Sequence, residues 1–384
     1  MPATPHRALY IAFAGMGATA SLIPASLPSL ADGLAVSTEV VLPAVPMLFA
    51  GLLLGVVLTP LLISRVTSAA VVRIGAAVQF CGLGVIAIAA APWMVLLGAA
   101  LAGIGFGFVE AGGTMLARQF GQPTVTRLLS LLTATVSVVA VVGPLLVVAA
   151  GALGVERAVL ALAAILQLTA ALLVRSDRAV APAQSTRRTP FVRGLIPLGI
   201  ALFLYVGIES VLSGWSAATV ESDLGTTATL AAVGTSAFWA LMTLGRLFGL
   251  GVLARHPHPR ALGLGAVALV AGGLISAVAV ASLSSAATLL LLAVAVFACG
   301  PCYALLVGAA VETMTAHRSA MGTSTLIAIG AIGGIVIPLL VLLAGGPGSG
   351  LWVAASFAAL AVVVLAATRP WRIAGPMPGG EGHP

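Results

Sequence analysis

Apolar runs long enough to cross a lipid bilayer recur from one end of the chain to the other. The hydrocarbon core of a membrane is about 30 Å thick, and a helix crosses it in about 20 residues. Of the 384 residues, 60% are hydrophobic and only 7% are charged, whereas a soluble domain carries about 25% charged residues. This composition leaves too little polar surface to face water. It predicts an all-α membrane protein without a soluble catalytic domain, and we do not expect an enzyme.

Polar residues and Pro/Gly positions divide the chain into twelve expected membrane helices. The first six are expected at 8–30, 39–63, 69–91, 92–119, 125–151 and 154–175. The second six are expected at 194–220, 226–254, 260–281, 284–314, 319–345 and 348–368. The first apolar run reaches residue 30, which is too long for a cleaved signal peptide, so we expect an uncleaved first helix.

The placement of arginine predicts the orientation of these helices. All 17 basic residues are Arg, and basic residues are enriched in cytoplasmic loops of membrane proteins. If the N-terminus is cytoplasmic, fifteen Arg fall in inner segments and only Arg157 falls in an outer loop. We therefore expect a multi-pass protein of the bacterial inner (plasma) membrane with both termini in the cytoplasm. The net charge of +7 then reflects topology, and no nucleic-acid partner is expected.

One long polar segment falls at the midpoint of the chain. Residues 176–193 read SDRAVAPAQSTRRTPFVR, which predicts a cytoplasmic linker between a six-helix bundle over 1–175 and a second over 194–369. The Gly/Pro-rich segment 370–384 is expected to be a disordered cytoplasmic tail.

Matched glycine and arginine positions indicate that the two halves are related. Gly55 and Arg65 recur as Gly245 and Arg255, in both cases 190 residues later. Gly143 and Pro144 of the fifth expected helix correspond to Gly333-Gly334 and Pro338 of the eleventh. Repeats at half-chain offset are typical of transporters built from two bundles. The residues expected to serve the relative movement of the halves are Gly55, Arg65, Gly245, Arg255, Gly143, Pro144, Pro338 and Glu312.

Four stretches resemble the fucose-permease-like branch of the major facilitator superfamily. They are GIGFGFVEAGGT (103–114), LYVGIESVLSGW (204–215), SAFWALMTLGRLFG (236–249) and CGPCYALL (299–306). The resemblance implies two pseudo-symmetric six-helix bundles and secondary transport by alternating access. It implies uptake of a small polar solute such as a sugar, driven by the proton gradient without a cofactor, by a monomeric chain whose partners are the solute and the bilayer.

The alternative is export of amphipathic compounds. The first expected helix carries no carboxylate, although sugar symporters of the branch have one there, and Gly143-Pro144 matches part of an antiporter motif. The low aromatic content of 5% also argues against tight sugar recognition.

Charged residues within membrane spans are costly and therefore indicate function. Glu110 and Arg246 lie eight and nine residues before the inner Arg118 and Arg255, which is roughly 12 and 13 Å deep. We expect these two side chains to pair across a central cavity. Glu110 and Glu209 are the candidates for proton coupling, because burial and neighbouring charges control the pKa of a carboxylate.

The expected solute contacts surround these charges. The guanidinium of Arg246 can bind an anionic or polyhydroxylated solute through its donor fork. Trp215 could stack on a sugar ring, and its alternative place is the interfacial aromatic belt. Glu312, six residues from Arg318, fits a salt bridge or a helix end. The candidate solute-binding residues are Arg246, Glu209, Tyr205, Trp215, Thr114, Trp239 and Tyr303.

Two other motifs do not indicate chemistry. Cys299 and Cys302 form a redox-like Cys-Gly-Pro-Cys motif, but it lies inside an apolar run and not at an exposed helix start. His256 and His258 have no acidic or cysteine partner nearby in sequence, so no metal is expected.

Overall fold

The computed structural model describes residues 5–118, 124–175, 196–225, 227–255, 259–312, 316–344 and 347–367. The first half contains α1 (Pro5–Gly33), α2 (Thr38–Val41), α3 (Ala44–Ile63), α4 (Ser68–Ala87), α5 (Pro92–Arg118), α6 (Thr124–Gly151) and α7 (Arg157–Leu173). The second half contains α8 (Ile196–Gly214), α9 (Ser216–Leu224), α10 (Ala228–Arg255), α11 (Pro259–Val280), α12 (Ser285–Glu312), α13 (Ala316–Leu343) and α14 (Pro347–Ala367).

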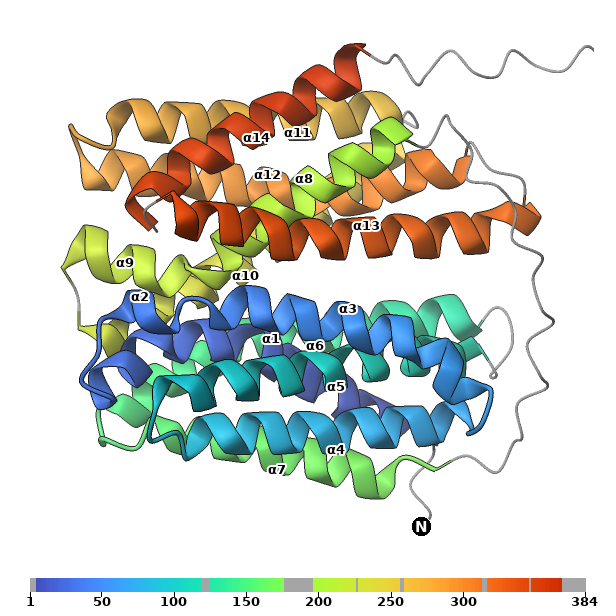
Figure 1. Cartoon of the computed structure of the whole chain (residues 1–384). Coiled ribbons are helices and arrows are strands. Elements are labelled where there is room, and N and C mark those ends of the chain that lie inside the picture. The colour runs from blue at the N-terminus through green and yellow to red at the C-terminus, as the bar shows by residue number, and fades with distance from the viewer. Residues whose placement is uncertain are drawn as a thin grey trace, which may run out of the picture.

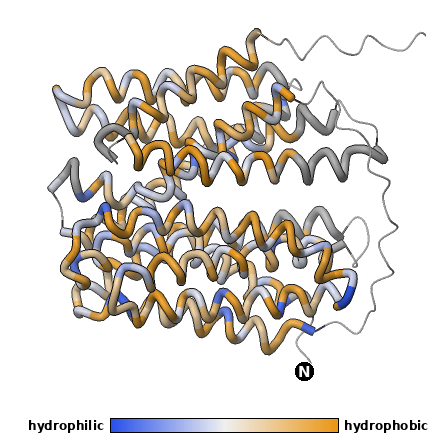
Figure 2. Tube along the Cα trace, in the orientation of Figure 1, coloured by the Kyte–Doolittle hydropathy of each residue, from blue (hydrophilic) through white to orange (hydrophobic). Residues whose placement is uncertain are grey.

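The described helices match the expected membrane spans. Nine spans in the described ranges are long and apolar enough to cross a membrane, and three shorter apolar helices occur at Arg157–Leu173, Ala328–Leu343 and Leu351–Ala367. Figure 2 shows hydrophobic residues along the whole length of most helices, with hydrophilic residues gathered mainly toward their ends. The predicted all-α membrane fold with twelve spans is therefore confirmed.

Two of the expected helices are interrupted, which the sequence analysis did not predict. The expected helix 39–63 is divided into α2 and α3 around Leu42 and Pro43, because proline has no N–H with which to continue the helical hydrogen bonds. The expected helix 194–220 is divided at Trp215, whose φ of −116° and ψ of 11° are not helical. The membrane spans keep their predicted positions in spite of both interruptions.

The helices form two layers that correspond to the two halves of the chain (Figure 1). In the first half, α3 and α4 both pack on α5, and in the second half α10 and α11 both pack on α12. The same pairing in both halves is what an internal repeat produces. The expected linker 176–193 and tail 370–384 lie outside the described residues.

Matched glycines place helices in backbone contact at equivalent positions of the two halves. A β-carbon on Gly55 would collide with the Ile104 carbonyl oxygen in α5, and one on Gly245 would collide with the Phe297 carbonyl oxygen in α12. Small residues permit this close approach of membrane helices. Leu or Val at either position would push the two helices apart.

A second matched pair of glycines follows the same offset. Gly17 in α1 lies against the Val136 backbone in α6, and Gly207 in α8, 190 residues later, lies against Gly333 and Ile337 in α13. The repeat that the sequence shows at Gly55 and Gly245 therefore extends to the way α1 and α8 are packed.

The two halves contact each other at the end of the molecule that carries α2 and α9, which we call the α2–α9 end (Figure 1). The Ser236 hydroxyl in α10 donates a 2.8 Å hydrogen bond to the Val141 carbonyl in α6. Nearer the helix ends, Gly214 packs directly against the Val45 side chain. These contacts lie on the opposite side of the molecule from the end of α7 and the start of α8, which the linker connects.

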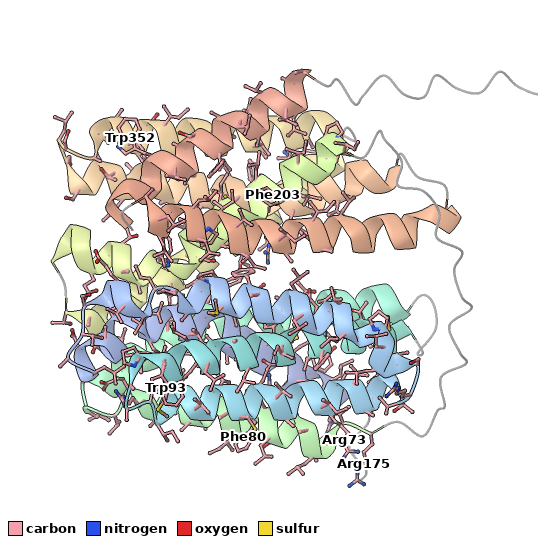
Figure 3. The ribbon with its side chains drawn as sticks, in the orientation of Figure 1. Arg73, Phe80, Trp93, Arg175, Phe203 and Trp352 are labelled. Carbon is pink, nitrogen blue, oxygen red and sulfur yellow. The ribbon has the colours of Figure 1, made fainter. Side chains whose placement is uncertain are left out.

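Exposed side chains differ between the two ends. Trp93 and Trp352 are 62% and 65% exposed, and Figure 3 shows them at the α2–α9 end of the two halves. Arg73 and Arg175 lie together at the other end (Figure 3), where the Arg73 Nε donates to the Ala171 carbonyl at 3.1 Å. Tryptophan favours the membrane interface and Arg the cytoplasmic side, so the Arg73 end is the one that we predict to be cytoplasmic.

Candidate functional site

Glu209, Arg246 and Tyr205 come together in the second half. Glu209 and Tyr205 are four residues apart on one face of α8, and the Glu209 carboxylate interacts electrostatically with Arg246 of α10. The buried Tyr205 hydroxyl donates a 2.9 Å hydrogen bond to the Cys299 carbonyl of α12, and the Glu209 carboxylate is a second acceptor within its reach. Three helices of one half therefore converge on this carboxylate.

Tyr303 connects this cluster to the first half. Its side chain, on α12, interacts electrostatically with Glu209 and also with Glu110 of α5. Glu110 belongs to the first half and Glu209 to the second, so Tyr303 has carboxylates of both halves within range. The sequence analysis named Tyr303 only as a solute contact, and its electrostatic interaction with carboxylates of both halves was not predicted.

The three charged side chains retain some accessibility. Glu110, Glu209 and Arg246 are each partly exposed, although Val109 and Ile208, next to the two carboxylates, are buried. A charge in the middle of a membrane helix is costly if it faces lipid, and such residues face a water-filled cavity or a partner. We infer that these side chains point toward the space between the halves.

The expected pair of Glu110 with Arg246 is not formed in this conformation. Among the described residues, Arg246 interacts with Glu209, whereas no charged partner acts on the Glu110 carboxylate. The reason is the helix arrangement: across the interface α10 packs on α6 and α1, and α5 is not among the helices that it mainly contacts. Equal depth in the membrane did not imply contact between the two side chains.

The other expected solute contacts are distributed around the cluster. Thr114 is half-buried one turn along α5 from Glu110. The Trp239 ring packs edge-on against Phe238, with centroids 5.5 Å apart and planes at 89°, and its buried Nε1 has no partner among the described residues. Trp215 is only 2% exposed, so it does not belong to a lipid-facing aromatic belt.

The residues expected to serve conformational change occupy different environments. Gly55 and Gly245 lie at helix contacts. A β-carbon added to Gly143 would lie 3.2 Å from the side chains of Ser21 and Leu22. Pro144 and Pro338 are buried inside α6 and α13. Arg65, which follows α3, and Arg255, at the end of α10, are exposed. Glu312 is the last residue of α12, and its side chain lies outside the described set.

A buried polar group in the first half was missed by the sequence analysis. The Thr19 hydroxyl donates to the Gln79 side-chain oxygen at 2.7 Å, and both residues are fully buried. Gln167 is also fully buried, and its Nε2 reaches the Ala12 carbonyl at 3.5 Å. The available signal was the presence of the polar Gln79 and Gln167 inside otherwise apolar helices.

Comparison with known proteins places the fold. No family model and no curated protein sequence matches the chain. The chain is similar in structure to a peptide transporter POT in complex with sulfate, with a TM-score of 0.78 and 14% identity over 95% of this chain and 93% of that one. It is also similar to a D-xylose-proton symporter, with a TM-score of 0.77 and 14% identity over 94% of this chain and 96% of that one.

A nucleoside transporter NupG is a further neighbour, with a TM-score of 0.71 and 15% identity over 95% of this chain and 99% of that one. The likeness covers both halves of the chain in each comparison. At this level of identity it establishes the fold and does not distinguish the fucose-permease-like branch from others. The chain is a multi-pass membrane protein with the two-bundle fold of the major facilitator transporters.

Proposed function

We propose that the chain is a secondary transporter that takes up a small polar solute, such as a sugar, together with protons. The observation that carries the proposal is that Tyr303 interacts electrostatically with Glu110 of one half and with Glu209 of the other. A site reached from both halves can respond to their relative movement. The likeness to a peptide transporter, a xylose-proton symporter and a nucleoside transporter supports the proposal at the level of fold.

The cluster suggests a division of roles. The guanidinium of Arg246 presents a donor fork to hydroxyl or carboxylate oxygens of a solute. Glu209 and Tyr205, which interact with Arg246, would hold this guanidinium in place. Glu110 lies without a charged partner in this conformation, which makes it the better candidate for binding and releasing a proton. Protonation would remove an uncompensated charge from the interior and so favour closure of the halves around it.

Glu110→Gln is expected to uncouple solute movement from protons. A neutral amide keeps the shape of the protonated carboxyl but cannot release a proton. In proteoliposomes, solute exchange between equal concentrations should persist while uptake driven by a pH gradient is lost. The solute is found first by thermal-shift screening of sugars, amino acids and nucleosides. Gradient-driven uptake by Glu110→Gln equal to that of the native chain would contradict the coupling role.

Export by proton antiport is the second candidate function. The observation that favours it is that the only carboxylate in α1 is Asp32, in the last turn at the α2–α9 end, so the part of α1 that crosses the membrane has none. Uptake with protons and export against protons predict opposite proton movements when solute is added outside. A pH-sensitive dye inside the vesicles reports this sign directly, and acidification of the interior on addition of solute outside identifies symport.

A disulfide across the α2–α9 end should stop transport. A β-carbon on Gly214 would lie 3.1 Å from the Val45 Cβ, close to the roughly 3.5–4.5 Å that a disulfide requires. In a Val45→Cys, Gly214→Cys chain whose native cysteines are replaced, oxidation should abolish uptake and reduction should restore it. Full uptake by the completely oxidised chain would exclude opening at this end. The unoxidised chain is the control.

The α2–α9 end should also close more readily at low pH. Burial and the nearby Asp32 carboxylate raise the pKa of Glu221, while a 3.4 Å hydrogen bond from the Thr38 hydroxyl opposes the rise. The raised pKa of Glu221 belongs to the conformation in which the α2–α9 end is closed. Protonation of Glu221 therefore favours the closed conformation over the open one, and this stabilisation is lost as the pH rises through the raised pKa. Other charged groups at this end are Glu39, Glu156 and Arg157.

Spin labels at Leu153 and Leu283, which are 78% and 80% exposed in outer loops of the two halves, report this closure. Their separation is expected to be shorter at about pH 4.5 than at about pH 7.5. Glu221→Gln should keep the short distance at both values, whereas Glu156→Gln should retain the native dependence. An unchanged distance in the native chain would count against the effect.

A further inference from the structure

A cavity lies inside the second half, on the α2–α9 side of the charged cluster. Its volume is about 360 Å3, and its walls come from α8, α9, α10, α12, the start of α14 and Ala281 before α12. Val211, Leu241 and Val296 line it, each within five residues of a member of the Glu209, Arg246 and Cys299 group. All described residues that line the cavity belong to the second half, so it is distinct from the space between the halves.

The walls of this cavity are apolar and uncharged. Leucine, valine, alanine and phenylalanine side chains make up most of the lining, and no charged residue is among them. Two lining hydroxyls already donate hydrogen bonds within their helices: Ser216 to the Ser213 carbonyl at 2.9 Å and Thr288 to the Ser284 carbonyl at 3.0 Å. A charged or strongly polar ligand would therefore lose its hydration without compensation.

One unsatisfied hydrogen-bond donor lies in the wall. Trp215 lines the cavity and is 2% exposed, and its buried Nε1 has no partner among the described residues. An indole nitrogen can only donate a hydrogen bond, and a buried donor without an acceptor is rare in folded proteins and costly. The nitrogen itself is covered by protein atoms, so an acceptor in the cavity would reach it after a rotation of the indole ring.

We propose that the cavity binds a small, neutral, largely apolar molecule with one acceptor oxygen, which receives the hydrogen bond from Trp215 Nε1. The absence of charged lining residues requires a neutral ligand, and the free indole N–H requires an acceptor. The volume lies at the lower end of the range of about 300–1,000 Å3 for small-molecule sites, which indicates a ligand smaller than a lipid. This site is separate from the proposed site for a polar solute.

Its position gives a bound molecule influence over movement of the halves. Trp215 separates α8 from α9, and the preceding Gly214 packs against Val45 of the other half. A ligand held by Trp215 therefore stabilises the segment through which the two halves touch. Occupancy of the cavity is expected to favour closure of the α2–α9 end.

The test compares two probes of the same shape on the purified full-length chain in detergent. 2-Adamantanone carries one ketone oxygen, and 2-methyleneadamantane replaces that oxygen with a CH2 group. Saturable thermal stabilisation gives an affinity for each probe. The native chain is expected to bind the ketone about five-fold more tightly, the contribution of one hydrogen bond. Trp215→Phe should reduce the ketone affinity to that of the alkene.

Matched variants separate the cavity from the micelle. Trp352→Phe removes an exposed tryptophan of the same half that does not line the cavity and should retain the preference for the ketone. Ala293→Phe, which fills the cavity from α12, should abolish saturable binding of both probes. Its folding is checked by gel filtration, and the Trp215→Phe result stands independently of it.

Three results would overturn the proposal. Equal affinities for both probes in the native chain would exclude the hydrogen bond, and a ketone preference that survives Trp215→Phe would exclude this donor. Unchanged binding in folded Ala293→Phe would show partition into detergent. Displacement of the ketone by added dioleoyl phospholipid would assign the cavity to an acyl chain, whereas indifference to lipid supports a small-molecule ligand.

Discussion

Glu209→Gln is expected to reduce solute uptake by about a hundred-fold or more, because it leaves the partly exposed Arg246 guanidinium inside the membrane span without its carboxylate partner. The amide preserves size and hydrogen bonding to Tyr205, so the loss is due to the charge. The measurement is the initial rate of uptake into proteoliposomes that contain equal amounts of folded protein. Both exchange and gradient-driven uptake should fall, in contrast to Glu110→Gln.

The control for this variant is Glu39→Gln, which removes an exposed carboxylate at the start of α2 and should transport at the native rate. Glu209→Asp tests the geometry, since it keeps the charge but shortens the side chain, and should retain part of the activity. Native uptake by Glu209→Gln would remove Glu209 and its pairing with Arg246 from the proposed site.

Gly245→Ala is expected to lower the free energy of unfolding by about 1–3 kcal/mol, because the added methyl group meets the Phe297 carbonyl oxygen of α12. Alanine ordinarily stabilises a helix relative to glycine by up to about 1 kcal/mol. A loss of stability in Gly245→Ala therefore indicates a close helix contact, whereas a gain would be due to helix propensity alone. Thermal unfolding in detergent measures it.

The same helix offers a matched control. Gly251 is exposed in α10, and a β-carbon there would meet nothing within 4 Å. Gly251→Ala should leave stability unchanged or raise it slightly. Equal destabilisation by both substitutions would mean that α10 and α12 are not in backbone contact at Gly245. Gly55→Ala is expected to behave as Gly245→Ala does, since it meets the Ile104 carbonyl oxygen.

The positions of the membrane spans could be predicted from the sequence because hydropathy is a property of each segment alone. The expected helix 92–119 became α5, Pro92–Arg118, and the expected helix 125–151 became α6, Thr124–Gly151. The repeat was visible because glycine at a helix contact cannot be exchanged for a larger residue, so Gly55 and Gly245 kept their offset.

The rest of the site depended on which helices are neighbours, and local sequence does not contain that information. Depth along a helix suggested that Arg246 would meet Glu110, but Arg246 interacts with Glu209 on the adjacent α8. The interruption at Trp215 occurs in a segment without proline, and the adjacent Gly214 did not mark it because glycines are also common inside the helices of this chain. The Thr19–Gln79 hydrogen bond joins residues 60 positions apart, and neither carries a charge that would have drawn attention.

The glycine contacts described above have a mechanical consequence. Within each half, helices touch backbone to backbone at Gly55 and at Gly245, with no side chain between them that could rotate. Between the halves, contact is made by side chains and by single hydrogen bonds such as that from Ser236 to Val141. We therefore expect each bundle to be stiffer than the plane between the bundles, so that a relative rotation of two nearly rigid bodies is the movement of lowest energy.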